Sequence, residues 1–250
     1  MDKQPLLNTY VNNIGMEEAV NKICQFVNEK KRSYVVAVNT DVIIKIENDE
    51  YLKMIADEAD LTLVDGKPLI WISKCIKCPV KEKISGSDLV PKLCQAAVEK
   101  GYTIFIIGGK EGVADSAKSN LERDYRNIKI VGTCSPPFGF EKDKEEIGKI
   151  NKKINEVKPD IVIACFGCPK QEKWVYENYR KYNATVTICA GATVDFLAGN
   201  VKRAPKWLSA LGLEWFYRFL QEPKRMFKRY FVDDLKIFKL VWKYRQEKKE

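Results

Sequence analysis

The chain contains no histidine in its 250 residues. Histidine is the commonest general base and metal-binding side chain, so its absence excludes Ser–His and Cys–His nucleophile pairs. Long hydrophobic runs are also absent. No apolar stretch reaches the roughly 18–20 residues that a membrane-spanning helix needs, and the first ten residues lack the apolar core of a secretory signal. We therefore expect a cytoplasmic protein that uses carboxylates, amides and cations for its chemistry.

Motifs of several other protein classes are missing as well. The chain has no Walker motif, no Gly-x-Ser-x-Gly nucleophile turn and no Asp-x-Asp metal pair. Its eight cysteines include two Cys-x-x-Cys pairs, at 75–78 and 165–168. Zinc knuckles bring such pairs much closer together in the sequence, so a structural zinc site is the less favoured alternative. We expect free and mostly buried thiols in a reducing compartment.

Positive charge is concentrated at the C-terminus. The chain has a net charge of +9, and residues 201–250 supply +8 of it, from fourteen Lys or Arg against six Asp or Glu. The same residues include three of the five tryptophans, Trp207, Trp215 and Trp242. A near-neutral body with a basic, aromatic tail predicts an α/β domain at 1–200 and a helical appendage at 201–250 that docks on an anionic surface.

Short apolar runs alternate with amphipathic stretches through residues 17–189. We expect strands at 34–38, 61–64, 103–107, 128–131, 161–165 and 185–189, and helices at 17–30, 41–58, from 68, 87–100, 111–123, 142–157 and 169–181. Nearly continuous apolar strands separated by helices predict a mostly parallel, Rossmann-like sheet with helices on both faces. In such sheets ligands bind at the carboxyl ends of the strands.

The pattern changes after Gly199. Pro205 and Pro223 can each open a helix as its first residue. The second helix has an apolar stripe at Phe227, Tyr230, Phe231, Leu235, Phe238 and Trp242, flanked by Lys and Arg. A basic amphipathic helix rich in aromatic residues suits a membrane interface. A helix packed on the domain with a solvated basic face is an equally good interpretation of the periodicity.

Polar, glycine-rich segments follow five of the expected strands. Gly108 and Gly109 come after one strand and before a helix, where backbone N–H groups can hold a phosphate. The alternative is a tight turn with a helix N-cap. The segment is not Gly-x-Gly-x-x-Gly, and no acidic residue ends the next strand. A nucleoside diphosphate is therefore a better ligand than NAD.

Two further strand ends carry candidate chemistry. Asp65 lies at a strand tip, where a partly desolvated carboxylate can act as a general base, although Asp-Gly also makes ordinary turns. Lys170 and Gln171 lie in the first turn of a helix and can donate hydrogen bonds to an oxygen-rich ligand. The alternative is that this Pro-Lys-Gln-Glu segment is simply a helix start.

Taken together, these segments resemble the WecG/TagA/CpsF family of bacterial glycosyltransferases over nearly the whole chain. The matching segments are Val-Asn-Thr at 38–40, Val-Asp-Gly at 64–66, Ser-Gly-Ser-Asp-Leu at 85–89, Phe-Ile-Ile-Gly-Gly at 105–109, Pro-Pro-Phe-Gly-Phe at 136–140, Phe-Gly-Cys-Pro-Lys-Gln-Glu-Lys-Trp at 166–174, Gly-Ala-Thr-Val-Asp-Phe-Leu-Ala-Gly at 191–199, Lys-Arg-Ala-Pro at 202–205 and Gly-Leu-Glu-Trp at 212–215. One departure is Ala37, where many members of the family have Thr.

The resemblance implies an inverting transfer of N-acetylmannosamine from its UDP donor to the 4-hydroxyl of GlcNAc on undecaprenyl diphosphate. No metal or other cofactor is expected. Asp65 is the candidate base, and Asn39 and Gln171 would position hydroxyl groups. Thr40, Gly108 and Gly109 would line the donor pocket, and Asp195 could hold the nucleotide. The other residues expected to bind substrate are Gly66, Ser87, Asp88, Gly167 and Lys170.

The departing diphosphate then needs positive charge. Arg218 and Arg225 are seven residues apart, so they project from one helical face, which Lys228 extends. We expect this face to close over the active site and to contact a diphosphate; contact with anionic lipid alone is the alternative. The tail would then be both a membrane anchor, at the inner face of the cell membrane, and an active-site lid.

Other functions remain open at this point. A nucleic-acid-binding protein with a basic arm would also show cations and aromatics, but it does not explain the near-neutral body and its polar strand ends. A nucleotide-dependent oxidoreductase is disfavoured by the imperfect glycine pattern. The sequence does not separate N-acetylmannosamine from its uronic acid or from other sugars, and it leaves open a homo-oligomer that forms away from the membrane.

Overall fold

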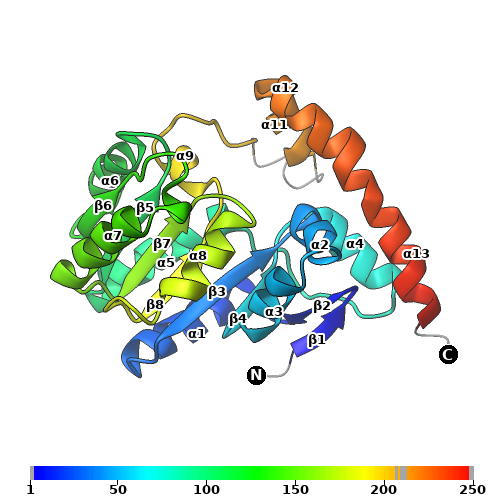
Figure 1. Ribbon diagram of the computed structural model, residues 1–250, viewed down its shortest axis with the longest axis horizontal. Coiled ribbons are helices and arrows are strands. Elements are labelled where there is room, and N and C mark those ends of the chain that lie inside the picture. The colour runs from blue at the N-terminus through cyan, green and yellow to red at the C-terminus, as the bar shows by residue number, and fades with distance from the viewer. Residues whose placement is uncertain (1–2, 206–207, 209–212, 248–250) are drawn as a thin grey trace.

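A six-stranded sheet forms the centre of the molecule (Figure 1). The computed structural model describes residues 3–205, 208 and 213–247, without the side chains of residues 225, 229 and 247. The strand order is β4-β3-β8-β7-β5-β6, and every neighbouring pair is parallel. The strands are β3 (Ser33–Val38), β4 (Leu61–Val64), β5 (Thr103–Gly108), β6 (Lys129–Cys134), β7 (Ile161–Cys165) and β8 (Val186–Cys189). The predicted parallel α/β fold is confirmed.

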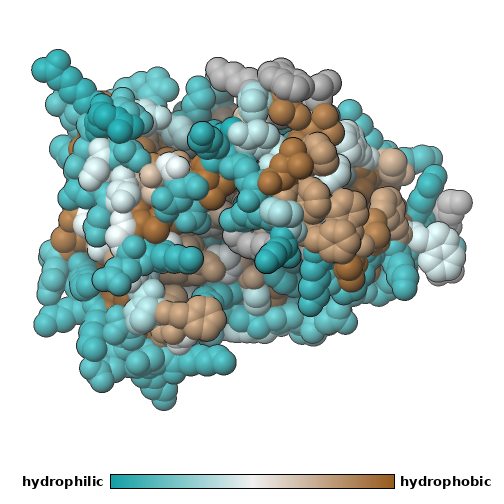
Figure 2. Space-filling model, turned by 90° about the horizontal axis from the view of Figure 1, so that it is seen from above, coloured by the Kyte–Doolittle hydropathy of each residue, from teal (hydrophilic) through white to brown (hydrophobic). Residues whose placement is uncertain are grey.

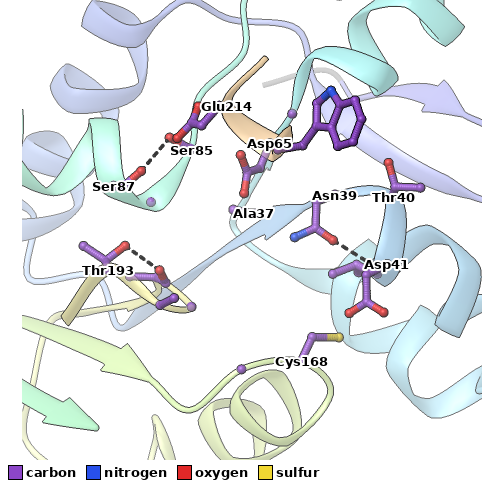
Figure 3. Close-up of a pocket in the computed structure, with 18 of the residues that line it drawn as sticks. Ala37, Asn39, Thr40, Asp41, Asp65, Ser85, Ser87, Cys168, Thr193 and Glu214 are labelled. Carbon is purple, nitrogen blue, oxygen red and sulfur yellow. Dashed lines mark hydrogen bonds between the residues drawn. The ribbon is translucent and has the colours of Figure 1, made fainter. Parts of the chain in front are cut away.

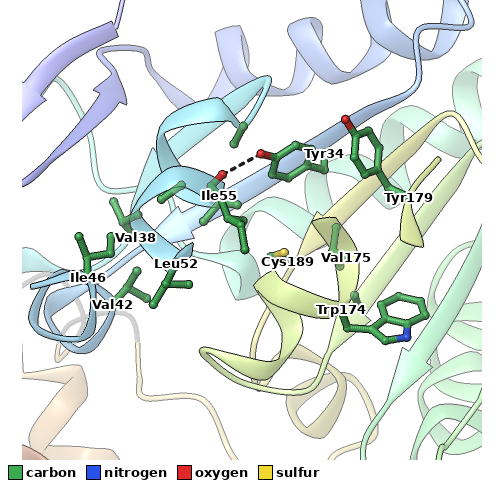
Figure 4. Packing of buried hydrophobic residues seen from close by; sticks show 14 of the residues in the cluster. Tyr34, Val38, Val42, Ile46, Leu52, Ile55, Trp174, Val175, Tyr179 and Cys189 are labelled. Carbon is green, nitrogen blue, oxygen red and sulfur yellow. Dashed lines mark hydrogen bonds between the residues drawn. The ribbon is translucent and has the colours of Figure 1, made fainter. Parts of the chain in front are cut away.

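Helices cover both faces of this sheet because successive strand residues point in opposite directions. Val36 and Val38 of β3 pack into one apolar layer, whereas Val35 packs into the other. The first layer lies under α2 (Thr40–Ile46), α3 (Glu50–Glu58), α4 (Lys67–Cys75), α7 (Lys144–Val157) and α8 (Lys170–Asn178), as Figure 4 shows in part. The second lies under α1 (Met16–Asn28), α5 (Gly86–Lys100), α6 (Val113–Asp124) and α9 (Thr193–Leu197).

Two local features differ from the sequence prediction. An antiparallel hairpin, β1 (Lys3–Leu6) and β2 (Thr9–Asn12), precedes the first helix. It is fixed to the domain because Asn12 Oδ1 accepts a hydrogen bond from the Thr62 backbone N–H at 2.8 Å. The single helix expected at 41–58 is two helices, since Asp49 caps α3 by accepting from the Leu52 N–H at 3.0 Å.

The C-terminal segment forms an arm of short helices beside the sheet domain (Figure 1). It comprises α11 (Glu214–Gln221), α12 (Pro223–Lys228), a π-helical turn (Arg229–Asp233), a 3-10 turn (Asp234–Lys236) and α13 (Ile237–Glu247). The helix expected from Pro205 falls mainly on residues outside the described part, and in the described part α11 begins at Glu214. In that part, no helix is both long and apolar enough to cross a membrane.

The arm packs on the domain through a few aliphatic side chains rather than through its aromatic stripe. Met226, Ile237 and Leu240 are buried, and Lys243 and Tyr244 contact Glu47 of the domain at 2.9 and 3.0 Å. The aromatic and aliphatic side chains on the outer side remain exposed: Phe227, Phe231, Val232, Leu235, Phe238 and Trp242. Figure 2 shows apolar residues gathered over the C-terminal helices on this side of the molecule. We call these six residues the outer face of the arm.

Candidate active site

One cavity of about 250 Å³ lies at the carboxyl ends of β3, β4, β7 and β8, and the C-terminal arm forms part of its wall. The residues predicted for the site that line it are Asn39, Thr40, Asp65, Gly66, Ser87, Gly167, Gln171 and Arg218. Parallel strands end at the same edge of a sheet, so residues distant in sequence converge there. The predicted location of the site, at the strand ends, agrees with this cavity.

Asp65 stands at the tip of β4 with its carboxylate directed into the cavity (Figure 3). Its backbone N–H donates to the Val38 carbonyl at 2.8 Å, which ties the tip of β4 to the end of β3. Gly66 follows with φ of 105°, a conformation that favours glycine. The Asp-Gly pair therefore turns the chain sharply and leaves the carboxylate at the cavity wall.

Asn39 caps helix α2 and faces the same space. Its Oδ1 accepts the Val42 backbone N–H at 3.1 Å, so the amide nitrogen is directed toward the cavity (Figure 3). Ala37 also lines the cavity. Ala37 therefore offers only a methyl group to the cavity at the position where many members of the family have Thr.

Gln171 is 3% exposed, and both ends of its amide are engaged. Its Oε1 accepts from the Gly191 backbone N–H at 2.9 Å, and its Nε2 donates to Glu172 Oε1 at 2.7 Å. Its neighbour Lys170 does not line the cavity. Lys170 instead lies 3.3 Å from Glu141 and 4.8 Å from the centre of the Phe138 ring.

Lys83 is a cavity residue that the sequence analysis missed. Its ammonium group lies 2.7 Å from Asp88 and 3.5 Å from Glu214 of the arm. Burial alone would lower the pKa of Lys83, but Asp88, Glu214 and Asp65 raise it overall. Lys83 therefore stays charged beside the proposed base. Lys83 lies two residues before the Ser-Gly-Ser-Asp-Leu segment, and this proximity to a family motif was the one feature of the sequence that could have identified it as a site residue.

Asp88 has a supporting position behind the cavity wall. It pairs with Lys83 and with Arg203, and its backbone N–H is capped by Ser85. Burial would raise the pKa of Asp88, but hydrogen bonds from Lys83, Ser85 and Arg203 lower it to about 2. An ionised Asp88 thus connects the strand-end loop to the start of the arm.

The residues of the arm that line the cavity wall are Glu214, Trp215, Arg218, Tyr230 and Asp234. The Arg218 guanidinium lies 5.4 Å from the centre of the Phe196 ring, which orients it. Trp215 and Tyr230 meet edge to face with ring centres 5.7 Å apart. Of these five, only Arg218 was predicted from the sequence, although Glu214 and Trp215 belong to one of the matching segments. Lys228 is exposed and outside the cavity lining, and the Arg225 side chain lies outside the described part.

Gly108, which ends β5, and Gly109, which follows it, do not line this cavity, and neither does Asp195. A Cβ atom on Gly108 would come within 2.2 Å of the Cys165 carbonyl oxygen, and one on Gly109 within 2.8 Å of Val113 Cβ. Close packing therefore explains both glycines. Asp195 lies in α9, and its carbonyl accepts from the Asn200 N–H at 3.0 Å.

The zinc site that the two Cys-x-x-Cys pairs left open is not seen among the cysteines of the described residues. All eight are free, and five are buried: Cys24, Cys94, Cys134, Cys165 and Cys189. Among the residues that the structure describes, no three His, Cys, Asp or Glu side chains are grouped closely enough to hold a metal ion.

Comparison with known proteins places these features in a family. The model of the glycosyl transferase WecG/TagA/CpsF family matches residues 4–250. A Bacillus subtilis protein, N-acetylglucosaminyldiphosphoundecaprenol N-acetyl-beta-D-mannosaminyltransferase, is 30% identical over 200 residues, which cover 80% of this chain and 76% of that protein. A protein of the same name from Bacillus spizizenii is 29% identical over the same shares of the two chains.

Proposed function

The chain belongs to the WecG/TagA/CpsF family of glycosyltransferases, and from this membership we propose that it transfers N-acetylmannosamine from UDP to the 4-hydroxyl of GlcNAc on undecaprenyl diphosphate. The product is the β-linked lipid disaccharide of the teichoic acid linkage unit. The observation that carries the proposal is the shared cavity, which is lined both by the Asp65 carboxylate after β4 and by the Arg218 guanidinium of the arm. The names of the two Bacillus relatives support the choice of sugar and acceptor.

Asp65 is the general base of this reaction. Its carboxylate takes the proton of the acceptor hydroxyl as that oxygen bonds to C1 of the donor sugar. The bond between C1 and the diphosphate oxygen breaks on the opposite face, and UDP leaves with the electron pair. Because attack and departure occur on opposite faces, the configuration at C1 inverts. Asn39 and Gln171 hold sugar hydroxyls in place, and Thr40 lines the donor side of the cavity.

Arg218 and Lys83 offset the negative charge that develops on the leaving diphosphate. Both line the cavity, and each has a defined position: Arg218 against Phe196, and Lys83 between Asp88 and Glu214. Fixed cations in a partly closed site stabilise developing charge better than mobile ions in water. The proposed reaction requires no metal ion, so a chelator leaves turnover unchanged.

The arm docks on the inner face of the cell membrane, where the lipid acceptor resides. Its outer face presents Phe238 and Trp242 with 67% and 68% of their surface exposed. Aromatic side chains insert at the membrane interface, and each cation near an anionic surface adds about 1 kcal/mol. The same segment then serves as anchor and as cavity wall, so residues 1–200 alone keep a folded sheet domain but lose turnover.

The deciding experiment is turnover of a GlcNAc-diphospho-lipid analogue with a panel of UDP-sugars, with products read by mass. We expect a disaccharide mass only with UDP-N-acetylmannosamine. Product from the uronic acid donor or another UDP-sugar would change the assigned sugar, and no product from any donor would refute the transferase proposal. In parallel, UDP raises the melting temperature, whereas NAD and an oligonucleotide do not.

A further inference from the structure

Glu172 is a buried carboxyl group that lines the cavity next to Gln171. It is 1% exposed and lies in the first turn of α8, after Gln171. Its Oε1 accepts the Gln171 amide at 2.7 Å, while Oε2 is buried without a hydrogen-bond partner among the described residues. A buried carboxyl with one unpaired oxygen costs free energy relative to an apolar side chain of similar size. Its presence therefore needs an explanation.

Among the described residues, no cation forms an ion pair with Glu172. Lys45 is the nearby cation, but its ammonium is held by Asp41 at 2.7 Å and by the Cys168 carbonyl at 2.9 Å. Burial raises the pKa of Glu172. Hydrogen bonds from the Gln171 amide, from its own backbone N–H and from the Cys168 thiol, together with the charge of Lys45, oppose this rise only in part. An ion pair therefore does not explain the presence of Glu172 at this position.

The contact that Glu172 does make determines how the Gln171 amide is oriented. With Oε1 on the Gly191 N–H and one Nε2–H on Glu172, the second Nε2–H is left for the cavity that Gln171 lines. A flipped amide would place its NH₂ group against the Gly191 N–H, donor facing donor. The two partners therefore select one of the two amide orientations.

We propose that Glu172 is a positioning residue that holds Gln171 as a hydrogen-bond donor to a sugar oxygen in the cavity. This inference rests on the proposed function for the identity of the ligand, but not for the amide orientation itself. Gln171 touches the sugar, and Glu172 acts only through Gln171. An aliphatic side chain at 172 would pack as well and would leave the amide free to turn.

The test compares Glu172→Leu with Glu172→Gln, whose side-chain oxygen can still accept from Gln171. We expect Glu172→Leu to lower kcat/KM about 10- to 100-fold, because small misplacements of positioning groups have effects of this size, while its melting temperature is equal or higher. Glu172→Gln restores turnover to within a few fold of the wild type. If Glu172→Leu does not fold, Glu172→Ala takes its place.

The double variant Gln171→Ala/Glu172→Leu separates positioning from a structural role. If Glu172 acts through Gln171, the double variant is no slower than Gln171→Ala alone. A further loss of tenfold or more in the Gln171→Ala background would overturn the proposal. So would a Glu172→Leu protein with wild-type kcat/KM.

A measurement without substrate keeps this inference apart from the transferase proposal. In the ¹H–¹⁵N NMR spectrum, the two Nε2 protons of Gln171 should exchange slowly with solvent in the wild type and in Glu172→Gln, because one of them is hydrogen-bonded to residue 172. In Glu172→Leu this bond is lost, so the signals should shift and exchange faster with solvent. Unchanged Gln171 signals in Glu172→Leu would refute the positioning role even if the donor sugar were a different one.

Discussion

Removing two aromatic side chains from the outer face of the arm should separate membrane binding from catalysis. Phe238 and Trp242 are four residues apart in α13, so they lie on one side of it. Neither lines the cavity, and both are exposed over about two-thirds of their surface. The double substitution Phe238→Ser/Trp242→Ser therefore leaves the chemistry in place and changes only the docking surface.

The expected size of the effect follows from the area that the two rings expose. An aromatic side chain has about 200 Å² of surface, so two-thirds of two rings is about 270 Å². If half of this area leaves water on docking, the gain at about 25 cal/mol per Å² is about 3 kcal/mol. The double substitution should weaken binding to vesicles on the order of 100-fold.

Sedimentation with vesicles of phosphatidylglycerol and phosphatidylcholine measures this binding, and two acceptors measure turnover. Turnover of a short-chain, water-soluble GlcNAc-diphospho-lipid should stay within twofold of the wild type, and turnover of the long-chain acceptor in vesicles should fall. Tyr10→Ser is the matched control, because Tyr10 is an exposed aromatic on β2, outside the arm. Equal vesicle binding by the double variant, or equal losses with both acceptors, would show that the docking argument is incorrect.

Three further predictions concern the body of the protein. Asp65→Asn should fold normally and bind UDP but lose about 10²- to 10⁴-fold in turnover, as expected for a general base; loss of UDP binding in calorimetry would instead make Asp65 a donor ligand. Gly108→Ala should lower the melting temperature much more than Gly112→Ala, because a Cβ at 112 meets nothing within 4 Å; equal effects would exclude the packing explanation. Asp88 has a folded-state pKa of about 2, below its ordinary value of 3.8, so its stabilising contribution is present above pH 4 and is lost as the pH falls toward 2. Acid unfolding of Asp88→Asn, followed by circular dichroism, should therefore show a weaker pH dependence in that window than the wild type.

The sheet and its helices were predictable because their apolar spacing is strong. The expected strands at 61–64 and 161–165 coincide with β4 and β7. The hairpin β1–β2 was missed because its strands have only four residues each, and the turn between them contains Leu7 with φ of 55° rather than a glycine. Only Asn8 favours a turn there, because leucine rarely adopts a left-handed conformation, so the composition signal is weak.

The site was predictable where its residues follow the strand ends and less so elsewhere. Asn39, Asp65 and Gln171 were found because parallel strands bring their ends together. Gly108 was expected to line the donor pocket, and sequence alone does not show that a neighbouring strand passes so close to its Cα. Lys83 was missed because a lysine in a loop gives no periodic signal, and only its position in the fold reveals its three acidic neighbours.

In the arm, the apolar stripe predicted from the sequence is not the side of the helices that packs on the domain. The stripe through Phe227, Phe231 and Phe238 was read from helical spacing, yet these rings face outward, and Met226 and Ile237 make the packing contact. The π-helical turn at Arg229–Asp233 changes the angle between successive residues there. A single helical period therefore does not describe the whole arm.

The arm places Arg218 and Tyr230 on the cavity, and the same segment exposes Phe227 and Phe231 to solvent. Two binding events that favour one arrangement of the same segment assist each other by equal factors. If docking favours the closed arrangement, a molecule loaded with nucleotide sugar resides longer on the bilayer than an empty one. Desorption would then follow product release rather than interrupt a round of synthesis.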